Sequence, residues 1–173
     1  MTDRRSFLRG TSVLLAHAAL GSVLSAFAAA PRKACYFNEP EMQALRSVVD
    51  IILPATDSPP ASAADTHHFI DLAIPACASA AGQKTFRAGL ADLVAAGFAP
   101  KPATEQFAWL KERAARDMPL AYEQSFFKML KDYTLTGYFL SETGATRALA
   151  YEKIPGGYWG DLPLAPNQKA WAI

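Results

Sequence analysis

The sequence has few of the residues that build common cofactor and metal sites. Its 173 residues include two cysteines and three histidines. They form no Cys-x-x-Cys-His haem attachment motif and no cysteine cluster for an iron–sulfur centre. A Gly-x-Gly-x-x-Gly fingerprint, a phosphate loop and a Gly-x-Ser-x-Gly elbow are also absent. We therefore expect no catalytic residue, no bound cofactor and no metal ion in this chain.

An excess of charge of one sign is missing as well. The formal net charge is +1 with histidine neutral, so electrostatics gives no basis for binding nucleic acid or anionic lipid. Apolar residues make up 51% of the chain, which excludes a disordered tail and favours a packed domain. We expect no nucleic-acid partner.

The first 28 residues have the composition of an export signal. A charged head is followed by an uncharged, Ala- and Leu-rich stretch over residues 11–27, and small residues predict cleavage after Ala28. The head resembles the twin-arginine signal of bacteria, which addresses a protein to the periplasm. The residues that carry this resemblance are Arg4, Arg5, Phe7 and Leu8. The alternative is that the same stretch is kept as a membrane anchor.

The export route itself has a consequence. The twin-arginine translocase carries folded proteins, most of which acquire a cofactor or a partner before they cross. A chain with such a signal and no visible cofactor site is therefore expected to escort another subunit. That subunit would fold with its cofactor in the cytoplasm and cross bound to this chain.

The rest of the chain predicts one all-α domain, a small bundle of five to six helices. We expect a linker over residues 29–37, a helical domain over 38–153 and an irregular C-terminal arm over 154–173. Asn38 with Glu41 indicates the first helix start, and Pro119 can open the most apolar and hence central helix. The expected helices lie at 38–53, 66–76, 83–96, from 104, from 119 and at 141–151.

The two cysteines leave three possibilities open. An oxidising compartment permits a disulfide between Cys35 and Cys77. The thiols could instead be unpaired, with Cys77 a small buried residue, or Cys35 could bond to a partner chain.

The histidines that follow the leader are adjacent. Neighbours on a helix point about 100° apart, so His67 and His68 are not expected to form a two-ligand metal face. Either could contact Asp71, which lies four or three residues further on.

Two stretches carry a family resemblance. Residues 134–146 read Thr-Leu-Thr-Gly-Tyr-Phe-Leu-Ser-Glu-Thr-Gly-Ala-Thr, and residues 53–59 read Leu-Pro-Ala-Thr-Asp-Ser-Pro. With the leader, they resemble the gluconate 2-dehydrogenase subunit 3 family, and the resemblance covers most of the chain after the leader. The family consists of small, exported subunits of membrane-associated dehydrogenases that face the periplasm.

The resemblance implies a non-catalytic role in export, assembly and stabilisation. The partner would be a large FAD subunit of the glucose-methanol-choline type that oxidises a sugar or sugar acid, often completed by a multihaem cytochrome c. Large aromatic side chains in the C-terminal third suit the interface, although they could equally pack in the chain's own core. These residues are Tyr138, Phe139, Tyr151, Tyr158 and Trp159.

Two other readings remain at this point. The chain could be a free-standing periplasmic helical protein that binds a small ligand or acts like a chaperone. It could also be an enzyme that uses His67, His68 and Asp71.

Overall fold

The computed structural model describes residues 35–152, 154, 156, 157, 161, 163 and 165–171. The predicted signal peptide with Arg4, Arg5, Phe7 and Leu8 lies outside the described residues, as do Tyr158 and Trp159. The predictions for these residues therefore stay predictions.

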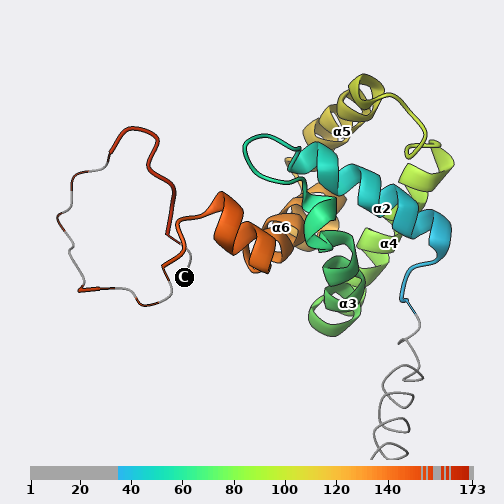
Figure 1. Ribbon diagram of the computed structural model, residues 1–173. Helices are drawn as coiled ribbons and strands as arrows, with labels where there is room; N and C mark the ends of the chain where they lie inside the picture. The colour runs from blue at the N-terminus through green and yellow to red at the C-terminus, as the bar shows by residue number, and fades with distance from the viewer. Residues whose placement is uncertain are drawn as a thin grey trace, which may run out of the picture. The chain divides into compact units, whose positions relative to one another are not determined.

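The described part of the chain is helical (Figure 1). Its α-helices are α2 (Glu39–Ile52), α3 (Thr66–Cys77), α4 (Ala80–Ala95), α5 (Ala103–Asp117) and α6 (Phe126–Phe139). Short 3-10 helices, η1 (Ala61–Ala64) and η2 (Tyr122–Gln124), and a π-helical turn, η3 (Gly144–Ala148), join or extend them. No strand forms within these residues, which confirms the all-α prediction. None of the helices described has both the length and the apolar character that crossing a membrane requires.

Helix α2 begins where the sequence predicts. The Asn38 side chain accepts a hydrogen bond from the Glu41 N–H at 3.0 Å, and the Glu41 carboxylate accepts one from the Asn38 N–H at 2.8 Å. This reciprocal pair satisfies two backbone donors that a helix start leaves free. The apolar stripe of α2 is buried from Met42 to Val49, so the helix contributes one face to the core.

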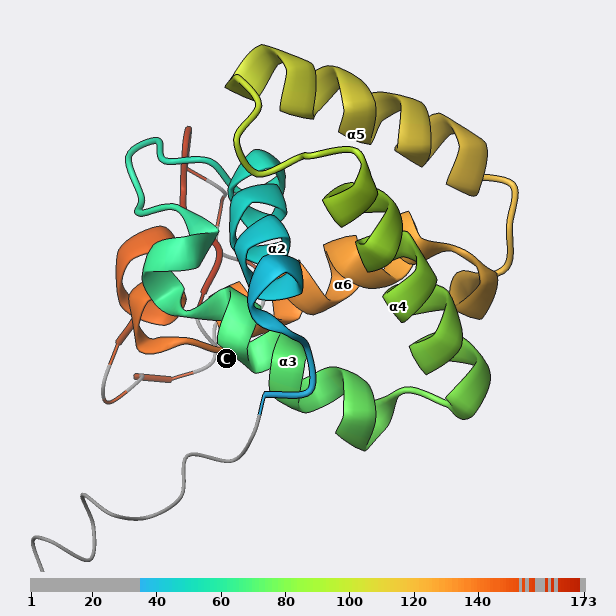
Figure 2. The same ribbon diagram turned by 90° about the vertical axis from the view of Figure 1, so that its right-hand side faces the viewer.

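Helix α6 is central, as predicted, and contacts α2, α3, α4 and α5 (Figures 1 and 2). Its predicted start at Pro119 is wrong. The helix begins at Phe126, where the Ser125 hydroxyl accepts a hydrogen bond from the Lys128 N–H at 3.0 Å. The 3-10 helix η2 occupies part of the intervening segment, and its residue Tyr122 is 44% exposed.

Two glycines let helices approach closely. A Cβ at Gly89 of α4 would overlap the ring of Phe126, and one at Gly137 of α6 would overlap the ring of Phe69 in α3. Each large ring therefore occupies space that only a glycine leaves open.

The domain begins before its predicted boundary. Phe37, the last residue of the predicted linker, is 2% exposed and packs in the core against Phe86 at a ring-centroid distance of 5.7 Å. Its N–H donates to Asp71 Oδ1 at 2.8 Å. The linker prediction is wrong for this residue, because a large aromatic side chain next to the helix start reaches the core.

The last predicted helix, at 141–151, is largely replaced by the π-helical turn η3, which ends at Ala148. Beyond it, the described residues of the arm form turns and contain no helix. The Ala150 N–H donates to the Ala170 carbonyl at 2.8 Å, and Lys169 Nζ donates to the Arg147 carbonyl at 2.7 Å. This part of the arm therefore contacts its own chain.

Candidate functional site

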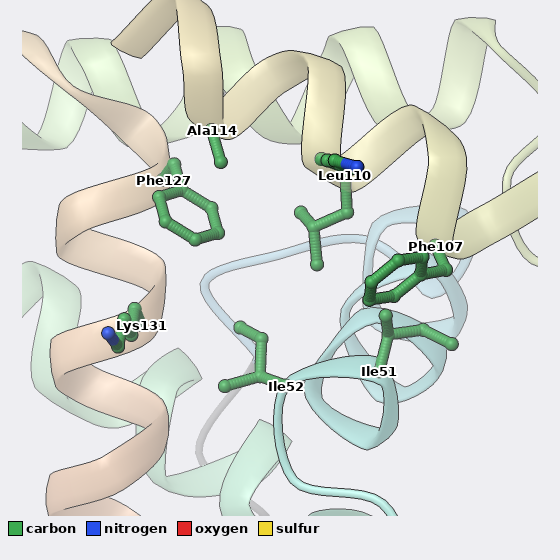
Figure 3. A pocket seen from close by; sticks show the side chains of 8 residues that line it. Ile51, Ile52, Phe107, Leu110, Ala114, Phe127 and Lys131 are labelled. Atoms are coloured by element: carbon green, nitrogen blue, oxygen red, sulfur yellow. The ribbon is translucent and has the colours of Figure 1, made fainter. Parts of the chain in front are cut away.

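An apolar groove lies between α2, α5 and α6 (Figure 3). It encloses about 250 Å³. Its lining comprises Ile51, Ile52, Phe107, Leu110, Lys111, Ala114, Phe127 and Lys131. Leu110 is buried at 5% exposure, whereas Phe107 on the same helix is 59% exposed. The groove therefore combines a packed floor with an aromatic side chain that remains open to solvent.

Helical spacing explains the groove. Its α5 residues recur at intervals of three and four positions between 107 and 114, which places them on one face of the helix. The last turn of α2 contributes Ile51 and Ile52, and α6 contributes Phe127. Among the α5 residues that line the groove, only Leu110 is buried. The described chain therefore covers this face of α5 only in part.

Lysines give the groove its charge. Lys111 of α5 and Lys131 of α6 line it, and both residues are exposed. Neither forms an ion pair with another residue in the part of the chain that the structure describes. A segment that offered apolar side chains together with carboxylates would complement this surface.

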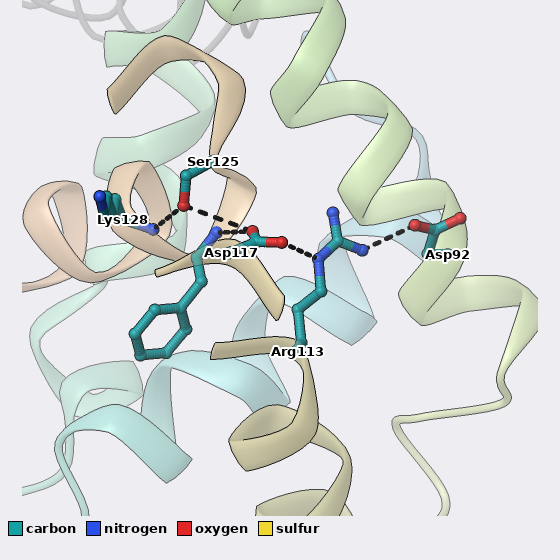
Figure 4. A network of polar contacts seen from close by, with 6 residues as sticks. Asp92, Arg113, Asp117, Ser125 and Lys128 are labelled. Carbon is teal, nitrogen blue, oxygen red and sulfur yellow. Dashed lines mark hydrogen bonds and ion pairs between the residues drawn. The ribbon is translucent and has the colours of Figure 1, made fainter. Parts of the chain in front are cut away.

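A polar network holds the α5 wall of the groove in place (Figure 4). Arg113 of α5 donates through Nη1 to Asp92 Oδ2 of α4 at 2.7 Å, and through Nε to Asp117 Oδ1 at 3.0 Å. The guanidinium also lies 5.1 Å from the centroid of the Phe126 ring, a cation–π distance. One arginine thus joins α5 to both α4 and α6.

The same network extends to the start of α6. Asp117 is 2% exposed, and its Oδ2 accepts hydrogen bonds from the Phe127 N–H at 2.9 Å and from Ser125 Oγ at 3.4 Å. A carboxylate at a helix N-terminus is favoured by the helix dipole. Since Phe127 lines the groove, Asp117 ties the end of α5 to the backbone of the opposite wall.

The aromatic residues predicted to form the interface differ in their burial. Tyr138 is 2% exposed and donates its hydroxyl to the Pro59 carbonyl at 2.7 Å, so the interface prediction is wrong for this residue. Phe139 is half-buried and packs against Tyr138 with a ring-centroid distance of 5.3 Å. Tyr151 is 58% exposed and remains available to a partner. The predictions for Tyr158 and Trp159 lie outside the described residues.

The sequence by itself does not reveal the groove. Phe107 and Phe127 carry the same apolar spacing as core residues, and nothing local distinguishes an uncovered apolar face from a covered one. The one available signal is composition, because α5 is rich in charged residues and has few apolar positions to hold it.

Both cysteines are exposed and free. Cys77 is the last residue of α3 and is exposed. The alternative in which an unpaired Cys77 is a buried apolar residue is therefore wrong. The structure does not contain the Cys35–Cys77 disulfide that the sequence permits.

The two adjacent histidines come together rather than diverge. The ring centroids of His67 and His68 are 4.2 Å apart, and donor atoms of Asp65, His67 and His68 all lie within 4.8 Å of one another. The expectation that the pair cannot share a face is wrong, because side-chain rotation in the first turn of α3 overcomes the angular offset. Asp71 does not join them; its Oδ1 accepts the N–H of Phe37.

The protein environment changes the pKa of His67. Desolvation lowers the pKa of His67 below its usual 6.5, and the neighbouring His68 and Arg46 lower it further. The shift of the His67 pKa therefore favours the neutral form of its imidazole.

Comparison with known proteins gives one match. The family model described as gluconate 2-dehydrogenase subunit 3 matches residues 39–156, which is more than half of the chain. No curated protein and no solved structure matches the chain. The matched residues include all the α-helices described above and stop within the C-terminal arm.

Proposed function

The chain belongs to the gluconate 2-dehydrogenase subunit 3 family, and on that basis we propose that it is the non-catalytic small subunit of an FAD-dependent sugar or sugar-acid dehydrogenase. Its task is to bind the flavoprotein subunit, to stabilise it and to accompany it across the inner membrane. The family match is the observation that carries this proposal. FAD belongs to the large subunit, and haem belongs to a multihaem cytochrome c where one completes the complex.

The groove supports the docking part of the proposal. An accessory subunit needs a surface that is apolar enough to bind and still soluble before the partner arrives. The surface around Phe107 meets this need, because it is apolar at the centre and carries Lys111 and Lys131. We assign it to a segment of the flavoprotein that presents apolar side chains beside carboxylates.

The leader supports the export part. The twin-arginine translocase would recognise Arg4 and Arg5, and the folded flavoprotein would cross bound to this chain. The complex would then work at the periplasmic face of the inner membrane. On this proposal the flavoprotein needs no signal of its own.

Co-expression tests the proposal directly. An FAD subunit of the glucose-methanol-choline type from the same organism is expressed with this chain, without it, and with a variant in which Arg4 and Arg5 are both lysine. We expect active, FAD-loaded enzyme in the periplasm only with the unaltered chain, and folded flavoprotein in the cytoplasm with the lysine variant. Full export and full activity of the flavoprotein in the absence of this chain would refute the proposal. Such a result would favour a free-standing binding protein.

A further inference from the structure

The N-terminal end of α3 gathers three metal-binding side chains, one from the residue before the helix and two from its first turn. Donor atoms of Asp65, His67 and His68 lie within 4.8 Å of one another. Asp65 has a left-handed backbone with φ of 52°, and although it precedes α3 its side chain makes no capping hydrogen bond. The carboxylate is therefore not used in the role that an aspartate at this position usually has.

Buried atoms without a hydrogen-bond partner lie at this same end of α3. Among the described residues, the buried side-chain atoms without a partner are Thr66 Oγ1 and His67 Nδ1. His67 is 6% exposed, so solvent does not freely satisfy its ring. A buried polar atom without a protein partner calls for a bound water or ion. This observation is independent of the clustering of the three side chains.

We propose that Asp65, His67 and His68 bind a divalent transition-metal ion of the zinc class. Two imidazoles and one carboxylate are a donor set that suits zinc and its neighbours better than magnesium or calcium. A metal ion about 2.0–2.2 Å from each of three donors draws them to roughly 3–4 Å from one another. Since Asp65 and His68 are exposed, rotation of their side chains is enough to close the remaining gap.

The surroundings leave room for the ion and its water ligands. Both histidines line a hollow of about 190 Å³, together with Cys35, Glu39 and Arg46. Arg46 opposes a cation there, whereas Asp65 and Glu39 favour it. With three protein ligands, the remaining coordination positions are open to water or to a donor from a partner. The site is separate from the apolar groove and shares no residue with it.

Zinc titration tests the proposal. The full chain is purified through a tag that contains no histidine and titrated with ZnCl₂ by calorimetry, with the Tm followed in parallel. We expect one Zn²⁺ per chain and a rise in Tm, because the ion binds only the folded site. Asp65→Asn and His68→Ala should each weaken binding at least about tenfold, since even loss of a group that merely supports a ligand costs 10–100-fold. Both should abolish the rise in Tm.

The variants are chosen so that folding is preserved. Asparagine tolerates the left-handed backbone at position 65, and His68 is exposed. Their Tm without zinc should match that of the wild type. His17→Ala removes a histidine of the leader and should leave binding unchanged.

Cys35→Ser separates this site from one built on the thiol. Loss of zinc binding in Cys35→Ser with full binding in Asp65→Asn and His68→Ala would overturn the proposal. The absence of saturable binding in the wild-type chain would overturn it as well.

Discussion

Asp117 has two structural roles, because one carboxylate oxygen pairs with Arg113 and the other accepts the N–H of Phe127. Its side chain is 3% exposed, so water cannot replace either partner. Asp117→Ala should lower the free energy of unfolding by about 3–5 kcal/mol, because it leaves the largely buried guanidinium of Arg113 without its buried carboxylate partner. Urea denaturation followed by circular dichroism measures the change.

Asp92 provides the matched control, because it pairs with the same arginine. Its side chain is 58% exposed, and an exposed ion pair contributes only about 0–1 kcal/mol. Asp92→Ala should therefore cost much less than Asp117→Ala. Equal losses in the two variants would show that the buried network does not hold α5.

At the residue scale, contacts between near neighbours in the sequence are predictable, whereas contacts that depend on distant residues or on side-chain rotation are not. The Asn38–Glu41 pair is predictable because both partners lie within one helical turn. The burial of Tyr138 depends on Pro59, a residue far away in the chain, so its spacing alone could not separate core from interface. The approach of His67 to His68 depends on side-chain rotation, which residue spacing does not specify.

Among the helices, the contact between α4 and α6 gives a second prediction. A Cβ at Gly89 would overlap the Phe126 ring. Gly89→Ala should destabilise the fold by about 1–3 kcal/mol, the usual cost of overpacking, even though alanine is the better helix former. Thermal or urea denaturation measures the loss.

A second substitution tests whether the Phe126 ring causes the loss of stability in Gly89→Ala. Phe126→Leu removes the ring that the new methyl group would meet, so adding it to Gly89→Ala should cost less than it does in the wild-type background. If the losses of stability in the two single variants simply add in the double variant, the Phe126 ring is not the cause of the destabilisation by Gly89→Ala. Gly156→Ala, at a position with no neighbouring atom within 4 Å, should leave stability nearly unchanged.

The helices were largely predictable from the sequence, but their ends were less so. Apolar spacing identified α6 as the central helix, because a stripe so wide must be covered on several sides. Pro119 predicts too early a start for α6, since proline is tolerated in the first turn of a helix but does not require a helix to begin there. The serine at position 125 completes the cap that fixes the true start. The groove was not predictable, because it depends on how three helices meet.

For the molecule as a whole, the groove gives a test of docking. Reversing both of its lysines, Lys111→Glu with Lys131→Glu, should weaken capture of the flavoprotein at least about tenfold, because like charges brought together across an interface cost several kcal/mol. Both residues are exposed, so stability should hardly change. The amount of flavoprotein retained on the immobilised chain, at equal loading, measures the effect.

The control variant has the same change in net charge, but at positions outside the groove. Lys84→Glu with Arg147→Glu reverses two exposed positive charges on α4 and η3. Capture by this variant should remain near the wild-type level. An equal loss in both pairs would attribute the effect to net charge and would contradict docking in the groove.

Because α5 has few buried apolar contacts with the rest of the domain, it affects how quickly the protein is degraded in the cell. Leu110 is the only apolar residue that α5 buries fully, so we expect this helix to detach more readily than the central α6. A detached α5 offers proteases an accessible backbone. A partner seated in the groove would clamp α5 and shield it, whereas an unaccompanied chain would be degraded. Turnover would then keep the supply of this subunit matched to the supply of the protein it serves.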